Sequence, residues 1–401
     1  MYISNLKLSN FRNYKTLNIN LDKNINIIIG NNGEGKTNLL ESIYVLGLTK
    51  SHRSFIDNNL IRNNCDSCKI KAKLNKDNYK SDLEVILENK NKILKIDKQI
   101  INKNSDYISN MNIIIFYPED LELIKGSPSV RRRFLNLELS QLNRNYLIIL
   151  NDYNKLLKMR NDYLKNSYID DNYLNILTDY LIDKAISIYK TRKKFIEKLN
   201  EQISDIYFDI AKIENFNIKY KTSIELDNNN YDDLKLKLKN KFNDVYNQEI
   251  KFKNTLVGPH RDDIEFYLGN LNLKLYGSQG QQRIAVLSLK IGEISIFRRY
   301  KEQTPILLLD DVFSELDQKK RNNLLKYIND NIQVIVTTTD VKNISKKILK
   351  NANIIKIKDG KIEEWYYGTK FRTLWFIWYS SIRRIRSSKK KTWNVYWYNR
   401  C

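Results

Sequence analysis

The sequence contains little cysteine, histidine, proline or glycine, with 3, 2, 4 and 12 of these residues in a chain of 401. So few cysteines exclude a disulfide framework. No apolar run approaches the ~18 to 20 residues that cross a bilayer, and residues 1–5 lack the apolar segment of a secretory signal. We therefore expect a soluble, cytoplasmic protein with no membrane partner.

Two of the cysteines, Cys65 and Cys68, have the Cys-x-x-Cys spacing of a zinc ligand pair. A structural zinc site needs four ligands, and no second pair or nearby histidine accompanies them. Surface thiols are therefore the expected interpretation, and a zinc site is the alternative.

Acidic residues are too few to balance the basic ones. The chain has 69 Lys and Arg against 46 Asp and Glu, a net charge of +23, which favours an anionic polymer such as DNA as a partner. Residues 366–401 contain basic and aromatic residues but no acidic ones. We interpret this segment as an aberrant, frameshifted tail, with nucleic-acid or membrane binding as the alternative.

Three of the 12 glycines fall within eight residues that fit the phosphate-binding pattern G-x-x-x-x-G-K-[ST]. A buried strand is predicted before them, at residues 25–29, and a helix after them. In this setting, backbone N–H groups at a helix N-terminus bind the phosphates of a nucleoside triphosphate. The predicted nucleotide-binding residues are Gly30, Asn31, Asn32, Gly33, Glu34, Gly35, Lys36, Thr37 and Asn38.

Four side chains are expected to serve the phosphates and the metal. Lys36 reaches the β- and γ-phosphates, and the Thr37 hydroxyl binds Mg²⁺. Residues 305–311 form an apolar strand that ends in Asp310 and Asp311. Asp310 is the second predicted Mg²⁺ ligand, and Asp311 orients or deprotonates the attacking water.

Residues 277–283, Gly-Ser-Gln-Gly-Gln-Gln-Arg, precede a predicted amphipathic helix. This segment resembles the signature motif of ABC-type ATPases, and residues 314–317 resemble their D-loop. In that superfamily the signature of one subunit closes over ATP bound by the other. The resemblance implies an ATP-dependent homodimer in which Ser278, with Gly280 and Gln281, meets the γ-phosphate in trans and Ser278 takes part in catalysis.

Two positions depart from the ABC pattern. Asp311 stands where these ATPases usually have glutamate, and residues 337–340, Thr-Thr-Thr-Asp, stand where they have the switch histidine. The shorter acid reaches less far, and threonine cannot shuttle a proton as imidazole does. We therefore expect slow hydrolysis, suited to a switch in which ATP closes a dimer on DNA and hydrolysis releases it.

The motifs together resemble the RecF family of bacterial recombination mediators, relatives of the SMC heads. This resemblance implies an ATP-dependent DNA-binding dimer that recognises single-strand/double-strand junctions or gaps. It also implies cooperation with RecR to promote RecA loading, with RecO in the same pathway. The resemblance spans residues 1–365, and the phrases that carry it are residues 10–14, 35–41, 51–53, 118–121, 125–128, 258–263, 278–283 and 309–317.

The expected fold is an α/β ABC/SMC-like ATPase head with mixed sheets and an inserted, mainly helical arm. We assign residues 1–125 and 251–365 to the two parts of the head, 126–250 to the arm and 366–401 to the tail. Helical spacing predicts long helices over residues 130–208, and a further strand and helix follow within 215–247. Strands are predicted at residues 3–8, 25–29, 69–74, 83–87, 113–116, 254–257 and 264–268.

Several basic residues have two open interpretations. Arg12 either approaches the phosphates or is a surface arginine at a strand end. His260 either lies near the nucleotide or the dimer face or is a hydrogen-bonded structural residue, and His52 is no stronger a candidate. The three arginines at 131–133 either contact DNA phosphates or begin a solvated helix.

Two other functions compete with DNA repair. The cytoplasmic ATPase subunit of a transporter normally has a shorter insertion between phosphate loop and signature than the arm between Thr37 and Gly277. A structural tether of the SMC kind needs long heptad arms or a partner that closes the ends, and neither is evident in the sequence.

Overall fold

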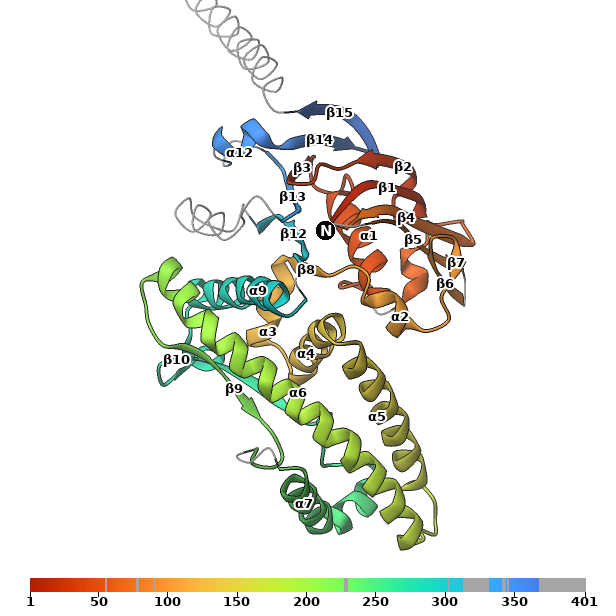
Figure 1. The fold of residues 1–401 in the computed structure, drawn as a ribbon, viewed down its shortest axis with the longest axis vertical. Helices are drawn as coiled ribbons and strands as arrows, with labels where there is room; N and C mark the ends of the chain where they lie inside the picture. The colour runs from red at the N-terminus through yellow and green to blue at the C-terminus, as the bar shows by residue number, and fades with distance from the viewer. Residues whose placement is uncertain are drawn as a thin grey trace, which may run out of the picture.

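The computed structural model describes residues 1–54, 56–76, 79–88, 91–226, 230–301, 303–312, 332–340, 344 and 346–367. Two six-stranded sheets and helix α1 (Lys36–Leu48) form a head, and long helices extend from it as an arm (Figure 1). The predicted α/β head with mixed sheets and a helical arm is therefore confirmed.

The first sheet is antiparallel, with strand order β2-β1-β4-β5-β6-β7. Its strands alternate as expected for a sheet with one buried face, since Cys68, Ile70 and Ala72 of β4 point to the core. The predicted strands at 3–8, 69–74 and 83–87 lie within it. The strands are β1 (Tyr2–Phe11), β2 (Tyr14–Asn20), β4 (Ser67–Asn75), β5 (Lys80–Glu88), β6 (Asn91–Ile96) and β7 (Gln99–Ile100).

The second sheet has the order β15-β14-β3-β13-β12-β8, and only the edge strand β15 runs antiparallel to its neighbour. Both faces are buried: Ile306 and Leu308 of β12 face the core around α1, while Leu307 and Leu309 face the arm. The strands are β3 (Ile25–Ile29), β8 (Ile113–Phe116), β12 (Ile306–Asp310), β13 (Val334–Thr338), β14 (Asn353–Lys358) and β15 (Lys361–Tyr367).

The topology of this second sheet places the predicted site. Strand β13 lies between β3 and β12, and all three are parallel. Their carboxyl ends therefore meet at one edge, so the phosphate loop after β3 comes next to Asp310 at the end of β12.

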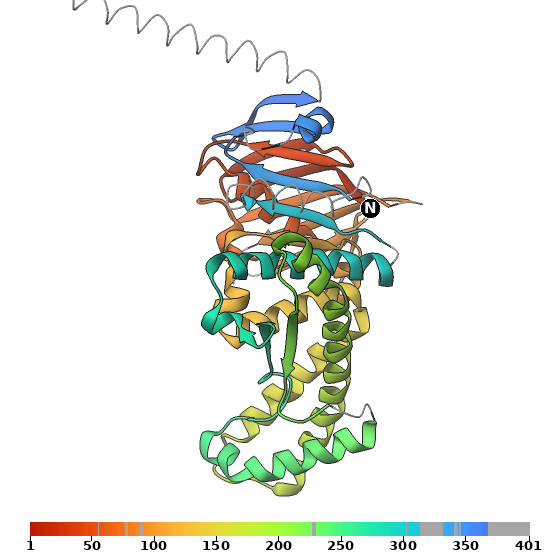
Figure 2. The ribbon, with the colours of Figure 1, turned by 90° about the vertical axis from the view of Figure 1, so that its left-hand side faces the viewer.

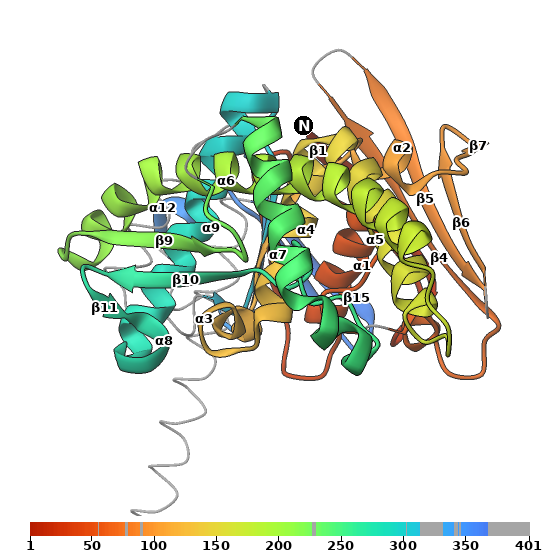
Figure 3. The same ribbon diagram turned by 90° about the horizontal axis from the view of Figure 1, so that it is seen from below.

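The arm consists of long helices and a three-stranded sheet of order β11-β10-β9 (Figure 3). Figure 2 shows α9 lying between the strands of the head and the arm helices, where it packs on α6 and β8. The long helices are α4 (Pro128–Leu142), α5 (Arg144–Tyr163), α6 (Asp171–Ala211), α7 (Tyr231–Phe252) and α9 (Gln279–Lys301), and the strands are β9 (Phe216–Lys221), β10 (Asp263–Leu268) and β11 (Leu271–Asn272). The short helices of head and arm are η1 (Asp57–Leu60), η2 (Pro118–Leu121), α2 (Asn104–Ile108), α3 (Glu122–Lys125), α8 (Leu273–Tyr276) and α12 (Lys346–Asn351).

Three sequence-based expectations are wrong. Residues 254–257 form a loop because side chains take their backbone donors: Thr255 N–H bonds Asn161 Oδ1 at 2.8 Å and Leu256 N–H bonds Glu249 Oε1 at 2.6 Å. Helix α9 is not amphipathic, since residues 284–294 are all buried between head and arm. Cys68 is a buried core residue and not a surface thiol.

Two other expectations are not tested by this fold. The predicted boundary near residue 250 separates β9 from its partner β10, so the division into head and arm segments stays a prediction. The D-loop at residues 314–317 and the tail beyond residue 367 lie outside the described residues. In the part of the chain that is described, no helix combines the length and apolar character needed to span a membrane.

Candidate nucleotide site

The phosphate loop follows β3 and turns into α1 through two glycines with positive φ. Gly33 has φ 85° and Gly35 has φ 110°, a region that favours glycine. A Cβ on Gly35 would lie 2.5 Å from Asn13 Nδ2 and 2.9 Å from the Tyr14 hydroxyl. The turn between β1 and β2 therefore packs directly against the loop, and this contact also requires glycine.

Lys36 is folded onto the loop that precedes it. Its Nζ donates to the carbonyls of Gly30 at 2.8 Å and Asn31 at 2.9 Å. Burial lowers the pKa of Lys36, while the nearby carboxylates of Asp311 and Asp310 oppose this shift. The ammonium group thus lies beside both strand-end carboxylates, as a phosphate-binding lysine should.

The loop backbone already holds an anionic oxygen. Glu34 accepts the N–H of Asn31 at 2.7 Å through Oε2 and the side-chain amide of Asn31 at 2.9 Å through Oε1. The carboxylate thus accepts a hydrogen bond from the kind of backbone N–H donor that would bind a phosphate oxygen.

The Asp310 carboxylate accepts hydrogen bonds from two hydroxyl groups, one on α1 and one on β13. Thr37 Oγ1 lies 3.0 Å from Asp310 Oδ1, and Thr337 Oγ1 lies 2.6 Å from the same oxygen. Burial raises the pKa of Asp310, and the bonds from Thr337 and Thr37 oppose that rise. The backbone N–H of Asp311 also donates to Thr337 Oγ1, at 3.0 Å. Both acids at the end of β12 are therefore fixed by the neighbouring strand.

Arg12 is neither free nor a simple surface residue, because Glu41 on α1 holds it. The guanidinium donates to both oxygens of Glu41, at 2.9 and 2.8 Å. Burial alone would raise the pKa of Glu41, but hydrogen bonds from Arg12 and Ser51 lower it. Arg53 joins this group through Asn38 Oδ1, at 3.2 Å. Asn38 in turn contacts Asn13, so these residues brace the start of α1.

Ser278 begins α9 at the surface. Gln281 N–H donates to Ser278 Oγ at 3.2 Å, and Ser278 N–H donates to Gln281 Oε1 at 2.8 Å, which is a capping box. Ser278 and Gly280 are exposed. The side-chain hydrogen bond of Ser278 stays within its own turn, with Gln281 as the partner.

The two histidines contact groups within the chain. His260 bonds the Tyr153 hydroxyl at 2.6 Å and the carbonyl of Thr255 at 3.1 Å, within the arm. His52 is buried, with edge-on ring contacts to Tyr44 and Tyr117. Burial lowers the pKa of both imidazoles to about 4.

The three arginines of α4 bind groups within the chain. Arg131 is buried and forms a paired contact with Asp263, at 2.6 and 2.9 Å. Arg132 donates to the carbonyl of Asp262 at 2.7 Å, and Arg133 to that of Ser51 at 2.7 Å. Arg131 therefore ties the arm to β10, which excludes it from a solvated surface.

Sequence reasoning missed Glu41 as part of the site. A buried carboxylate has to be paired, and Glu41 stands in α1 among the apolar positions Leu39, Leu40 and Ile43. A charged residue on the buried face of a predicted helix is the signal that identifies such a carboxylate.

A phosphate loop, a strand-end carboxylate pair beside it and a helix that begins at the signature residues define the ATPase head of an ABC/SMC-type protein. A family model described as the RecF/RecN/SMC N terminal domain matches residues 2–363. The chain belongs to this family and, within it, to the RecF proteins.

Two kinds of relatives support this assignment. The DNA replication and repair proteins RecF of Bacillus cytotoxicus and Bacillus cereus are each 41% identical to this chain and cover 90% of it and 98% of their own length. The structure of the recombination mediator protein RecF-ATP in the RecFOR pathway has a TM-score of 0.85 and 30% identity over 91% of this chain and 97% of its own. An SMC head bound to the C-winged helix domain of ScpA shares the fold, with a TM-score of 0.53 and 16% identity over 93% of this chain and all of its own.

Proposed function

We propose that the protein is an ATP-dependent DNA-binding protein of recombinational repair and replication restart. It dimerises on ATP at single-strand/double-strand junctions or gaps and helps RecR to load RecA, with RecO in the same pathway. The observation that carries the proposal is the contact between Thr37 and Asp310, because it adds a metal-binding pair to the phosphate loop. The repair and RecFOR names of the relatives support the pathway.

The residues present fit ATP and Mg²⁺. The loop backbone binds the anionic Glu34 carboxylate, and Thr37 and Asp310 offer the hydroxyl and carboxylate oxygens that Mg²⁺ prefers. Thr37 and Asp310 would hold the ion, which when bound neutralises charge on the phosphates. Lys36 then exchanges the carbonyls of Gly30 and Asn31 for phosphate oxygens.

Asp311 orients or deprotonates the attacking water in this proposal. Its backbone is fixed by Thr337, a residue that cannot take up a proton at neutral pH. The site therefore lacks the imidazole that relays protons in related ATPases. We infer a weak, DNA-dependent ATPase whose slow hydrolysis releases the DNA-bound dimer.

The proposed dimerisation is supported by the exposure of the signature residues Ser278 and Gly280. Ser278 is exposed at the N-terminus of a 23-residue helix, where backbone donors and the helix dipole favour an anion. A second protomer would bring its Ser278, Gly280 and Gln281 to the γ-phosphate held by Lys36. Each protomer thus has half of a site.

We further propose a domain division and a location in the cell. Residues 1–125 and 251–365 form the head, 126–250 the arm, and 366–401 an aberrant tail. The protein acts in the bacterial cytoplasm, on the nucleoid, where gapped DNA is its partner.

The experiment is a binding assay with gapped and intact duplexes of equal length, with and without ATP. The wild-type chain should prefer the gapped duplex only with ATP. Lys36→Met removes the phosphate contact and Ser278→Arg blocks the trans contact, so both should lose that preference. ATP-independent binding of all three chains would contradict the proposal. A transporter subunit would show no preference for gaps.

A further inference from the structure

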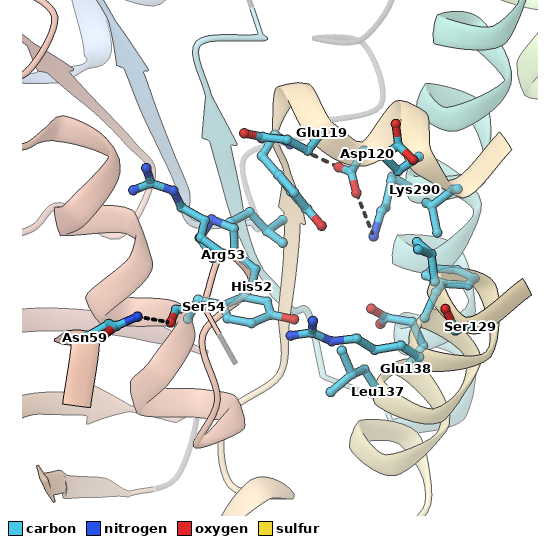
Figure 4. A pocket seen from close by; sticks show the side chains of 18 of the residues that line it. His52, Arg53, Ser54, Asn59, Glu119, Asp120, Ser129, Leu137, Glu138 and Lys290 are labelled. Atoms are coloured by element: carbon cyan, nitrogen blue, oxygen red, sulfur yellow. Dashed lines mark hydrogen bonds and ion pairs between the residues drawn. The ribbon is translucent and has the colours of Figure 1, made fainter. Parts of the chain in front are cut away.

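A cavity of about 780 Å³ lies between the head and the first helix of the arm. In Figure 4, His52 and Arg53 of the head line one side of it, and Asp120, Glu138 and Lys290 line the other. The ammonium of Lys290 points toward Asp120 in this view. The side of the cavity formed by Lys290 is an ion cluster that the nucleotide site does not use directly.

The cluster joins one lysine to three carboxylates. Lys290 Nζ lies 4.0 Å from Asp120 Oδ1 and 3.8 Å from Glu293 Oε2. Glu138 Oε2 accepts from Gln141 Nε2 at 3.2 Å, and its charge acts on Lys290. All four charged side chains are buried, with at most 6% of any of them exposed.

The charges of this cluster do not balance. Burial would lower the pKa of Lys290, but Glu293, Asp120 and Glu138 raise it, so the ammonium persists. Burial raises the pKa of Asp120 to about 6 and that of Glu138 to about 7, and it raises the pKa of Glu293 strongly. Without the ammonium, each of the three buried carboxyl groups that is ionised would have no countercharge, which is costly.

The four residues come from three segments that are separate in the sequence. Asp120 lies in η2, Glu138 in α4 at the start of the arm, and Lys290 and Glu293 in the signature helix α9. Segment η2 also borders the nucleotide site, because a small cavity is lined by Asp310, Asp120 and Arg283. Ser278 begins the same rigid helix that carries Lys290.

We propose that Lys290 is the positioning residue of the signature helix: its charge holds α9 against η2 and α4, so that Ser278 is presented to the partner's nucleotide. This role rests on the proposed ATP-dependent dimer. In this proposal the charge of Lys290 matters and its volume does not, because the ammonium offsets the carboxylates of η2, α4 and α9. Neutralising those carboxylates should therefore compensate for loss of the lysine.

The test measures ATP-dependent dimerisation of the full chain by sedimentation at pH 8 and pH 6. Lys290→Met should weaken dimerisation at pH 8 by at least about tenfold, equivalent to about 1.4 kcal/mol. Binding of a fluorescent ATP analogue to the monomer should change less than about threefold, since Lys36 and its loop are untouched. Lys290→Arg, which keeps the charge, should dimerise like the wild type.

Protonation of the buried carboxyl groups should restore ATP-dependent dimerisation of the Lys290→Met variant at pH 6, because neutral carboxyl groups no longer repel one another. Adding the second substitution Glu138→Gln to Lys290→Met should restore part of the dimerisation at pH 8. A side chain that only fills space would respond to neither change. The groups that face Lys290 from the packed elements are Tyr44 of α1, Tyr117 and Asp120 near η2, Glu138 of α4 and Glu293 of α9.

Each outcome decides the role of Lys290. The proposed role would be overturned if the Lys290→Met variant dimerised as tightly as the wild type at pH 8. An equal defect of the variant at pH 6 and pH 8 would also overturn it. If Lys290→Met does not fold at pH 8, the double variant Lys290→Met/Glu138→Gln takes its place, and it should dimerise more tightly at pH 6 than at pH 8. A wild-type chain that stays monomeric with ATP would instead overturn the proposed function.

Discussion

The hydroxyl of Thr337 donates to Asp310 Oδ1 across 2.6 Å, from one parallel strand to the next. The same oxygen also accepts the Thr37 hydroxyl of the phosphate loop, at 3.0 Å. Thr337 further accepts the N–H of Asp311. A residue at the place of the switch histidine therefore holds both acids of the neighbouring strand.

Replacing Thr337 should slow ATP hydrolysis more than it weakens ATP binding. Thr337→Val removes a hydrogen bond to a charged oxygen, worth about 1.5 to 3 kcal/mol, so kcat should fall roughly tenfold to a hundredfold. Thr337→Ser keeps the hydroxyl and should stay close to wild type in a steady-state assay. Thr338→Val is the matched control, because the Thr338 hydroxyl bonds the carbonyl of Asp340 instead. Equal effects of both valine substitutions would contradict the assigned role.

The two positive-φ glycines of the phosphate loop should differ in tolerance. Gly35→Ala places a Cβ 2.5 Å from Asn13 Nδ2, whereas Gly33→Ala meets no atom within 4 Å. Both substitutions carry the left-handed strain of about 1 to 2 kcal/mol, but only Gly35→Ala also displaces the β1–β2 turn. Titration with an ATP analogue should show a clearly larger loss of affinity for Gly35→Ala. The reverse order would contradict the loop geometry.

Neutralising Glu138 should stabilise the protein in a pH-dependent way. Burial raises the pKa of Glu138 from 4.5 to about 7. Below pH 4.5 the carboxyl group therefore does not lower the free energy of unfolding, and above that pH the loss grows until the pH passes 7. Glu138→Gln should therefore raise the free energy of unfolding by about 3 kcal/mol at pH 8 and by less than about 1 kcal/mol at pH 5. Urea denaturation at both pH values measures this difference. The exposed neighbour Glu119, changed to Gln, is the control, and an equal gain at both pH values would argue against the assignment.

Both histidines should remain neutral at mildly acidic pH. Burial lowers the pKa of His52 and His260 to about 4, from 6.5. The unfolded chain binds protons first, so these two groups remove stability as pH falls from 6.5 toward 4. In NMR spectra, neither imidazole should titrate between pH 8 and pH 5.5. A midpoint near 6.5 for either ring would show that it is solvated.

Much of the fold followed from short-range patterns. The buried runs at residues 25–29 and 113–116 became β3 and β8 with the predicted bounds, because parallel strands of a sheet covered on both faces are largely apolar on both. The strand predicted at 254–257 failed because the side chains of Glu249 and of Asn161, which is distant in sequence, bind its backbone. The burial of α9 on all sides depends on the arm and the head packing over it, which a helical period cannot show.

The site was predictable where a motif fixes the chemistry. The phosphate loop and Asp310 lie together as expected, since the parallel strands of one sheet bring their carboxyl ends to one edge. The pairing of Arg12 with Glu41 was not predicted, because it joins a turn to a helix through side chains alone. The Lys290 cluster likewise joins three separate segments, and single-sequence patterns do not report such contacts.

Mixing two inactive variants tests the composite site most directly. Lys36→Met has a disabled phosphate loop and an intact Ser278, and Ser278→Arg has the opposite. In a mixed dimer, one site combines the intact loop of one chain with the intact signature of the other. The account predicts that each variant alone is inactive and that the mixture hydrolyses ATP at up to about a quarter of the wild-type rate, from the statistics of a two-fold dimer. A mixture as inactive as its components would contradict a site shared between protomers.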